Sequence, residues 1–140
     1  MKSVNFFLLC ITLMFSTTVL FGADLEDLSF SIKYDSVTIT DCKTTAGGAL
    51  EIPNTISGYP VTRIGNAAFR SCSNLTSVLL PDGIVSIGEE SFYSCSKLAE
   101  VIVPSSVTTI GESAFRYCSS LVAMVLPEGL ISISESTFHG

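Results

Sequence analysis

A 23-residue interval runs through most of this 140-residue chain and limits its fold more than any other feature. Six sets of residues share the interval, and all six keep one register. The sets are Phe69, Phe92, Phe115 and Phe138; Ile64, Ile87, Ile110 and Ile133; Gly65, Gly88 and Gly111; Cys72, Cys95 and Cys118; Leu75, Leu98 and Leu121; and Pro81, Pro104 and Pro127. The chain is therefore predicted to be a repeat protein in which each unit forms one coil of a solenoid.

Each unit carries the signals of a strand, a turn and a short helical segment. Residues 75–80 follow the pattern L-x-x-V-x-L, which is typical of a half-buried strand. Pro81 ends that strand because it has no N–H to donate, and Gly88 permits the turn that follows. Residues 89–96 are predicted to form one or two turns of α- or 3₁₀-helix, with Phe92 and Cys95 on the inner side.

A single unit of this kind cannot bury its own apolar residues, so the units must stack. Equivalent strands would then pair in parallel at about 4.7–4.9 Å, and equivalent side chains would form ladders. Burial of each phenylalanine in such a ladder contributes roughly 1.5–3 kcal/mol. Residues 49–140 are predicted to form the solenoid, with about four units of which the last is incomplete.

The segment before the regular units breaks the interval. Pro53 precedes Pro81 by 28 positions, which indicates an insertion of five residues around residues 57–61. Residues 30–34 and 37–40 alternate like the two strands of a hairpin, with Asp35 and Ser36 at the turn. Residues 24–48 are therefore predicted to be an N-terminal β-hairpin cap that covers the first open edge of the stack.

The other end of the stack has no comparable cap in the sequence. The chain stops at Gly140, one position before the next cysteine of its column would fall. An uncapped solenoid exposes apolar surface and an unpaired strand edge. Two interpretations stay open: the chain is a fragment of a longer array with further repeats, or a partner covers this open C-terminal end.

Residues 1–23 have the pattern of a secretory signal peptide. Lys2 precedes an apolar run from residue 4 to residue 15, and Gly22 and Ala23 offer small residues for cleavage. The run is also long enough for an uncleaved membrane anchor. Acidic residues follow it instead of a basic stop-transfer cluster, which favours cleavage. The protein is predicted to be secreted or attached to the cell surface, and a periplasmic location is compatible with the same signal.

Charge and composition remove several classes of function. The chain has 13 acidic and 7 basic residues and a formal net charge of -6, which would repel phosphate backbones and anionic lipid. Nucleic acid and, beyond the signal peptide, membrane are therefore not expected as partners. No G-x-S-x-G, H-E-x-x-H, C-x-x-C, P-loop or dinucleotide fingerprint occurs, and His139 is the one histidine. We expect no enzyme activity, no cofactor and no metal site.

The repeating unit L-x-x-V-x-L-P-x-x-I-x-x-I-G-x-x-x-F-x-x-C resembles the BspA-type leucine-rich repeat, which occurs on the surfaces of bacteria and some parasitic protists. The likeness covers about residues 49–140; Ser134 in place of glycine and the missing last cysteine are departures. The resemblance implies a right-handed solenoid of the α/β repeat class with parallel strands on one face. It also implies a role in adhesion, host protein binding or another cell-surface interaction, although fold alone does not identify a ligand.

The cysteine column admits several interpretations. Neighbours on adjacent coils would lie about 5 Å apart, a span that a disulfide can bridge, but equivalent side chains on parallel coils point the same way. A zinc site needs about four converging ligands, and a nucleophile needs a base, which the terminal His139 does not supply. A buried ladder of free thiols is the favoured interpretation. Cys42 stands apart in the predicted cap with no evident partner.

The outward positions of the predicted strands are the candidate ligand-binding site. The residues are Glu51, Leu79, Ile102 and Val125 in one column, and Ser77, Glu100 and Ala123 in the column beside it. One interpretation is that β-branched residues are simply good strand formers. The other is an adhesive face that binds a protein or glycan ligand, since open solenoids commonly bind on their strand face. A structural spacer that presents another domain is the alternative function.

Overall fold

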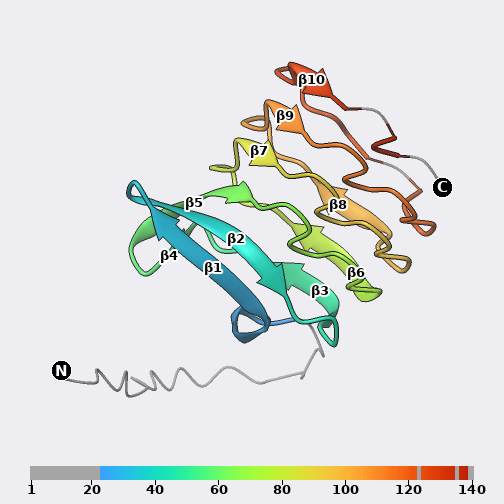
Figure 1. Ribbon diagram of the computed structural model, residues 1–140, viewed down its shortest axis with the longest axis horizontal. Coiled ribbons are helices and arrows are strands. Elements are labelled where there is room, and N and C mark those ends of the chain that lie inside the picture. The colour runs from blue at the N-terminus through green and yellow to red at the C-terminus, as the bar shows by residue number, and fades with distance from the viewer. Residues whose placement is uncertain (1–22, 123, 135, 139–140) are drawn as a thin grey trace, which may run out of the picture.

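The computed structural model describes residues 23–122, 124–134 and 136–138, and it shows a stack of parallel coils (Figure 1). A 3₁₀-helix, η1 (Leu25–Asp27), precedes ten strands. The strands are β1 (Leu28–Lys33), β2 (Ser36–Cys42), β3 (Gly47–Glu51), β4 (Thr55–Ile56), β5 (Tyr59–Ile64), β6 (Asn74–Leu79), β7 (Ser86–Ile87), β8 (Glu100–Ile102), β9 (Thr109–Ile110) and β10 (Ser132–Ile133). Most of the predicted signal peptide lies outside the described residues.

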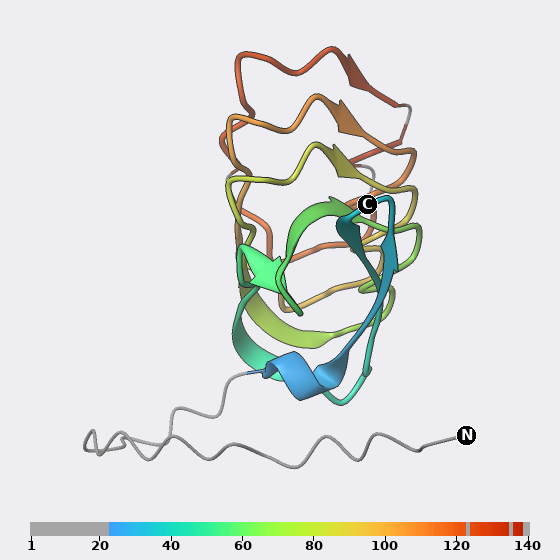
Figure 2. The ribbon, with the colours of Figure 1, turned by 90° about the vertical axis from the view of Figure 1, so that its left-hand side faces the viewer.

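Two sheets run along the stack. The three-stranded sheet has the order β3-β6-β8 and is parallel throughout. The larger sheet has the order β1-β2-β5-β7-β9-β10, and it is parallel from β2 onward. Ser77 pairs with Glu100 and Ser86 pairs with Thr109, so partners in the regular coils of both sheets are 23 positions apart. The predicted solenoid of short parallel strands is confirmed, and Figure 2 shows its coils one above another.

The segments between the two sheets contain no helix, so the predicted helical turns and the α/β class are not confirmed. Residues 89–94 form consecutive turns, in which Glu90 and Ser94 adopt left-handed φ angles of 51° and 59°. The N–H groups of Glu90, Phe92 and Ser94 donate to carbonyl groups of the next coil at 2.8–2.9 Å. A helix would direct these donors along its own segment. Here they are used to join neighbouring coils, and η1 is the one helix among the described residues.

The core consists of ladders between the two sheets. The rings of Phe69, Phe92 and Phe115 are buried and stack nearly parallel, with centroids 4.8 and 5.1 Å apart. The isoleucines that end strands β5, β7 and β9, namely Ile64, Ile87 and Ile110, are buried in the same way. Parallel stacking of identical units therefore places each repeated apolar residue against its own copies.

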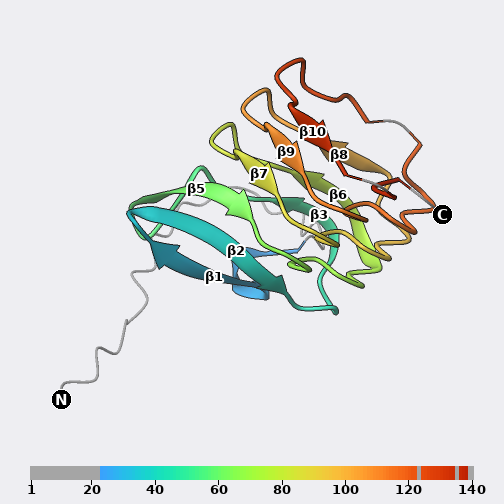
Figure 3. The same ribbon diagram turned by 45° about the horizontal axis from the view of Figure 1, so that its top comes forward.

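The N-terminal hairpin continues the larger sheet. Strands β1 and β2 are antiparallel, and β2 pairs in parallel with β5 of the first coil (Figure 3). The turn lies at Tyr34 and Asp35, one position earlier than predicted, because Ser36 already pairs with Lys33. Both turn residues have positive φ, as a tight hairpin turn requires. The role of residues 24–48 as a cap stays a prediction.

The inserted residues of the first coil form a second hairpin. Strands β4 and β5 pair antiparallel around Ser57 and Gly58, which have φ angles of 53° and 84°. A side chain at Gly58 would resist that angle. The insertion is therefore a protrusion from the coil and leaves the stacking register of β5 with β7 intact.

The last coil is less enclosed than the others. The side chains of Val125 and Ile131 are exposed, and Phe138 retains 47% of its surface. Residues 124–126 form no strand, so β8 is the last strand of the three-stranded sheet. Within the part of the chain that the structure describes, no helix is both long and apolar enough to cross a membrane.

Candidate functional site

The outward face of the three-stranded sheet carries most of the predicted binding residues. Glu51, Leu79 and Ile102 are direct partners in the strand register. Leu79 and Ile102 leave 41% and 53% of their surfaces exposed. Ser77 and Glu100 are also register partners and form the neighbouring outward column. Strand alternation sends the residues between them inward, so the outward columns are not needed to fill the core.

A hollow of about 650 Å³ lies in front of this sheet, and we call it the sheet groove. Five predicted residues line it, namely Glu51, Ser77, Leu79, Glu100 and Ile102. A sixth predicted residue, Val125, does not line it. Val125 lies in the last coil beyond β8, with 84% of its surface exposed, and Ala123 lies outside the described residues.

One wall of the sheet groove comes from a segment that the sequence analysis did not select. Ala23, Asp24 and Leu25, at the start of η1, line the groove beside β3. Asp24 caps this short helix: its carboxylate accepts from the Leu25 N–H at 2.6 Å, and its own N–H donates to Asp27 at 3.2 Å. The two aspartates three positions apart form a reciprocal cap, and this spacing is the sequence signal that would have located η1.

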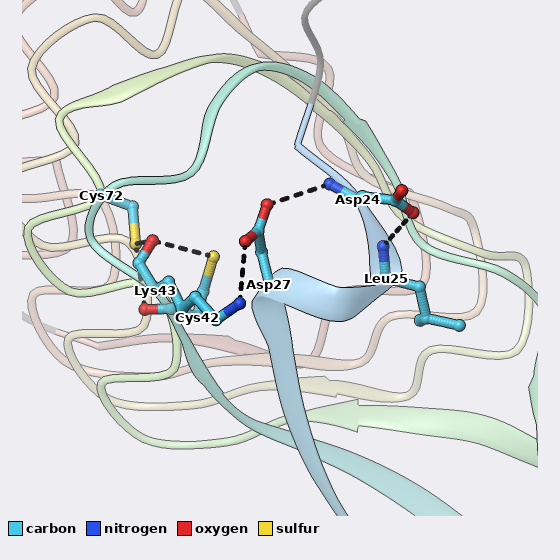
Figure 4. A network of polar contacts seen from close by, with 6 residues as sticks. All are labelled: Asp24, Leu25, Asp27, Cys42, Lys43 and Cys72. Carbon is cyan, nitrogen blue, oxygen red and sulfur yellow. Dashed lines mark hydrogen bonds and ion pairs between the residues drawn. The ribbon is translucent and has the colours of Figure 1, made fainter. Parts of the chain in front are cut away.

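The wall is attached to the end of the hairpin through Lys43 (Figure 4). Its ammonium group lies 3.4 Å from the Asp27 carboxylate, and its backbone N–H donates to the Asp27 carbonyl at 2.8 Å. The ion pair is exposed, so it contributes on the order of 0–1 kcal/mol. The backbone hydrogen bond is the firmer of the two attachments because it does not depend on a long side chain.

The sheet groove combines apolar and acidic surface. Its described lining includes the apolar side chains of Leu79 and Ile102 and three carboxylates, those of Asp24, Glu51 and Glu100, with no basic residue. Such a surface attracts cationic groups over about 10 Å at 0.1 M salt, and it offers apolar contact once they arrive. The arrangement suits a ligand that carries both apolar and basic groups.

The cysteine ladder lies inside the core, as predicted. Cys95 and Cys118 are buried, and each thiol donates at 3.0 Å to the carbonyl of the phenylalanine one coil earlier, Phe69 and Phe92. Burial raises the pKa of Cys118 to about 11 and raises the pKa of Cys95 further. These thiols are therefore protonated near neutral pH. No group of three or more metal-ligating side chains comes together among the described residues.

A second side-chain cluster lies on the turn segments. The Arg70 guanidinium lies over the Tyr93 ring and pairs with Glu90, while Arg116 lies over Tyr117. The two tyrosine rings meet edge to face with centroids 5.2 Å apart. The contacts of Arg70 and the contact between the two tyrosine rings join neighbouring coils, and the sequence analysis did not single these groups out.

The comparisons with known proteins agree with this architecture. A family model described as the BspA type leucine rich repeat region matches residues 42–140 with six copies. A leucine rich repeat protein of T. pallidum is 30% identical with a TM-score of 0.72; the match covers 78% of this chain and 51% of that protein. The chain thus spans about half the length of that protein.

Two further solved structures are similar. A leucine-rich repeat protein from Bacteroides capillosus is 27% identical with a TM-score of 0.73, and the match covers 83% of this chain and 89% of that one. A leucine rich cell surface protein from Faecalibacterium prausnitzii is 28% identical with a TM-score of 0.64, over 80% of this chain and 38% of that one. A comparison with curated proteins gave no match.

Proposed function

The chain belongs to the BspA-type leucine-rich repeat family, and on that premise we propose that it is an exported, non-catalytic module that binds a protein ligand in the sheet groove. The ligand segment would place apolar side chains against Leu79 and Ile102 and basic side chains near Glu51 and Glu100. The proposal concerns the residues of the three-stranded sheet, because Val125 is separate from the groove.

One observation carries this proposal: the outward register positions of the three-stranded sheet bear exposed aliphatic residues beside carboxylates. Replacing an exposed aliphatic side chain removes no packing from the core. Such a side chain contributes hydrophobic free energy only when a binding partner covers it. Protein interfaces have apolar centres with polar rims, and the groove has this composition. A protein segment fits it better than a glycan, whose surface is mainly hydroxyl groups.

The proposed export and surface location have separate support. The N-terminal sequence has the pattern of a signal peptide, and a similar structure is described as a cell surface protein. Adhesion of the kind that the family resemblance implies would then be one use of the groove. Members of this fold also occur as parts of longer chains, since the match covers only 38% of the F. prausnitzii protein. That fact favours a spacer role as the second candidate.

The test is a selection from a phage-displayed library of random peptides on the purified chain. We expect selected peptides to combine apolar residues with lysine or arginine. Ile102→Glu should reduce their affinity at least tenfold, about 1.4 kcal/mol, because it removes apolar contact and forces a charged carboxylate to lose water against the apolar side chains of the peptide. Surface plasmon resonance would measure the dissociation constants.

Ser86→Glu is the matched control, because Ser86 holds the outward position of β7 on the other sheet. It adds the same charge outside the groove and should leave peptide affinity within about twofold, since exposed charges this far apart are largely screened. Equal loss in both variants, or selected peptides that bind Ile102→Glu as well as the original chain, would contradict the proposal. Failure to select any peptide would favour the spacer role.

A further inference from the structure

The end of the N-terminal hairpin brings a second thiol to the cysteine ladder. Cys42, the last residue of β2, retains 3% of its surface, and Cys72, two positions before β6, retains 0%. Both sulfur atoms lie 3.7 Å from the same oxygen, the carbonyl of Lys43, and the Cys72 sulfur lies 3.6 Å from the carbonyl of Cys42 (Figure 4). Two thiols that share one acceptor are close neighbours.

The later coils have no such pair, and the hydrogen bonds explain why. The thiols of Cys95 and Cys118 reach back to the carbonyl groups of Phe69 and Phe92. The thiol of Cys72 reaches back to Cys42 in the same way. The carbonyl of Cys42 is therefore the acceptor that a phenylalanine carbonyl provides in each later coil. Among the described residues, Cys72 is the one thiol of the ladder whose acceptor residue in the previous layer is itself a cysteine.

The two thiols influence each other's ionisation. A side-chain hydrogen bond between them lowers the pKa of Cys72 and raises the pKa of Cys42 well above its usual range. Burial, which raises the pKa of Cys95 and Cys118, also opposes ionisation at Cys72 but is outweighed there. In the folded chain the contact between the two thiols therefore favours the thiolate of Cys72 over that of Cys42.

We propose that Cys42 and Cys72 are joined by a disulfide bond that ties the N-terminal hairpin to the first regular coil. The oxidant would be a small-molecule disulfide such as oxidised glutathione, or the disulfide of a thiol oxidoreductase. One of the two cysteines attacks, as its thiolate, one sulfur of the oxidant and releases one thiol as leaving group, which gives a mixed disulfide. The other cysteine then loses its proton and attacks the sulfur of the first, so a second thiol leaves and the two cysteine sulfurs are bonded.

The exchange takes place before the hairpin has docked, because both side chains are buried in the folded chain. The bond would also fix one wall of the sheet groove. Lys43, next to Cys42, holds η1 through Asp27, while Cys72 leads directly into β6. This consequence rests on the proposed function, whereas the disulfide itself does not depend on any ligand.

The experiment uses the full chain with Cys10→Ser, which leaves four thiols. The protein is unfolded and refolded with a mixture of oxidised and reduced glutathione, free thiols are alkylated in denaturant, and the peptides are mapped by mass spectrometry. We expect one cross-linked pair, Cys42 with Cys72, and alkylated Cys95 and Cys118. The bond would close the loop between residues 42 and 72. It should therefore raise the melting temperature of the oxidised protein by roughly 5–15 °C over the reduced protein.

Cys42→Ala and Cys95→Ala are the matched variants, since both remove one buried thiol. Each variant is compared with itself in oxidised and reduced form: Cys42→Ala should lose the temperature shift and Cys95→Ala should keep it. If Cys42→Ala does not fold, the peptide map of the unaltered cysteines decides the question. Alkylation of both Cys42 and Cys72 after oxidative refolding, or a cross-link from Cys72 to Cys95, would overturn the proposal.

Discussion

The two sheets of the solenoid are built from the same 23-residue unit, yet their outward faces differ. The larger sheet presents a polar ladder across its short strands, formed by Arg63, Ser86, Thr109 and Ser132. The three-stranded sheet presents Glu51, Leu79 and Ile102 at equivalent outward positions. Inward residues are buried and aliphatic in both sheets before the last coil, for example Ile87 and Ile110 in the larger sheet and Val78 and Val101 in the three-stranded sheet. The comparison teaches that stacking determines the inward side alone, and the outward side is free to serve another purpose.

The largest effect should come from the core that both sheets share. Phe92→Ala removes a fully buried ring between two stacked neighbours and should cost about 3–5 kcal/mol of unfolding free energy. Because the ring supports both sheets, their amide protection should fall together, as measured by hydrogen exchange at Ile87 and Val101. Phe138→Ala is the control, with less than half that cost, since this ring is half exposed. Loss of amide protection in one sheet alone would show that the two sheets unfold independently of each other.

An intermediate effect is expected where coils approach most closely. Gly111 directly follows β9, and a Cβ atom there would meet the backbone nitrogen of Glu89 in the preceding coil. Gly111→Ala should therefore cost roughly 1–3 kcal/mol in urea unfolding, because backbone must shift to accommodate the methyl group.

Gly129 offers a matched control for this substitution. A Cβ atom at Gly129 would lie 3.7 Å from the Ser105 carbonyl oxygen, an ordinary contact. Gly129→Ala should leave the urea midpoint nearly unchanged. Similar midpoints for the two variants would mean that the coils accommodate a methyl group at position 111 without a loss of stability.

The smallest effect should come from exchanging the outward chemistry of the two sheets. Ile102→Thr and Thr109→Ile each replace one β-branched residue with another at an outward position. Each variant should stay within about 0.5 kcal/mol of the original unfolding free energy, measured by urea denaturation. A cost above about 2 kcal/mol for Ile102→Thr would mean that this residue belongs to the core, and the proposed binding face would then lose its main argument.

The repeat interval made the stacking predictable. Because identical residues recur in one register, the sequence determines which side chains meet their own copies, and Phe69, Cys72 and Leu75 are buried as expected. Five outward residues of the candidate site could be located from strand alternation alone. Their role in binding stays a prediction.

Other features depend on contacts that no single unit contains. The turn segments look helical by spacing, but donors such as the Glu90 N–H bond to the next coil, which local propensity cannot indicate. The wall formed by Asp24 and Leu25 depends on how the hairpin end lies against β3. The contact of Cys42 with Cys72 joins residues 30 positions apart, which the 23-residue interval does not indicate. Each miss arises where a residue's partner lies outside its own unit.

The direction of the coil-to-coil hydrogen bonds has a mechanical consequence. Donors from both sheets and from the turn segments bond to the adjacent coil, so a pull along the stack loads the coil interfaces in series. In a series arrangement the weakest interface parts first, and the others are relieved. Among the described coils that interface is the last, where the ring centroids of Phe115 and Phe138 are 5.8 Å apart. Under tension the protein should lengthen coil by coil instead of rupturing at once.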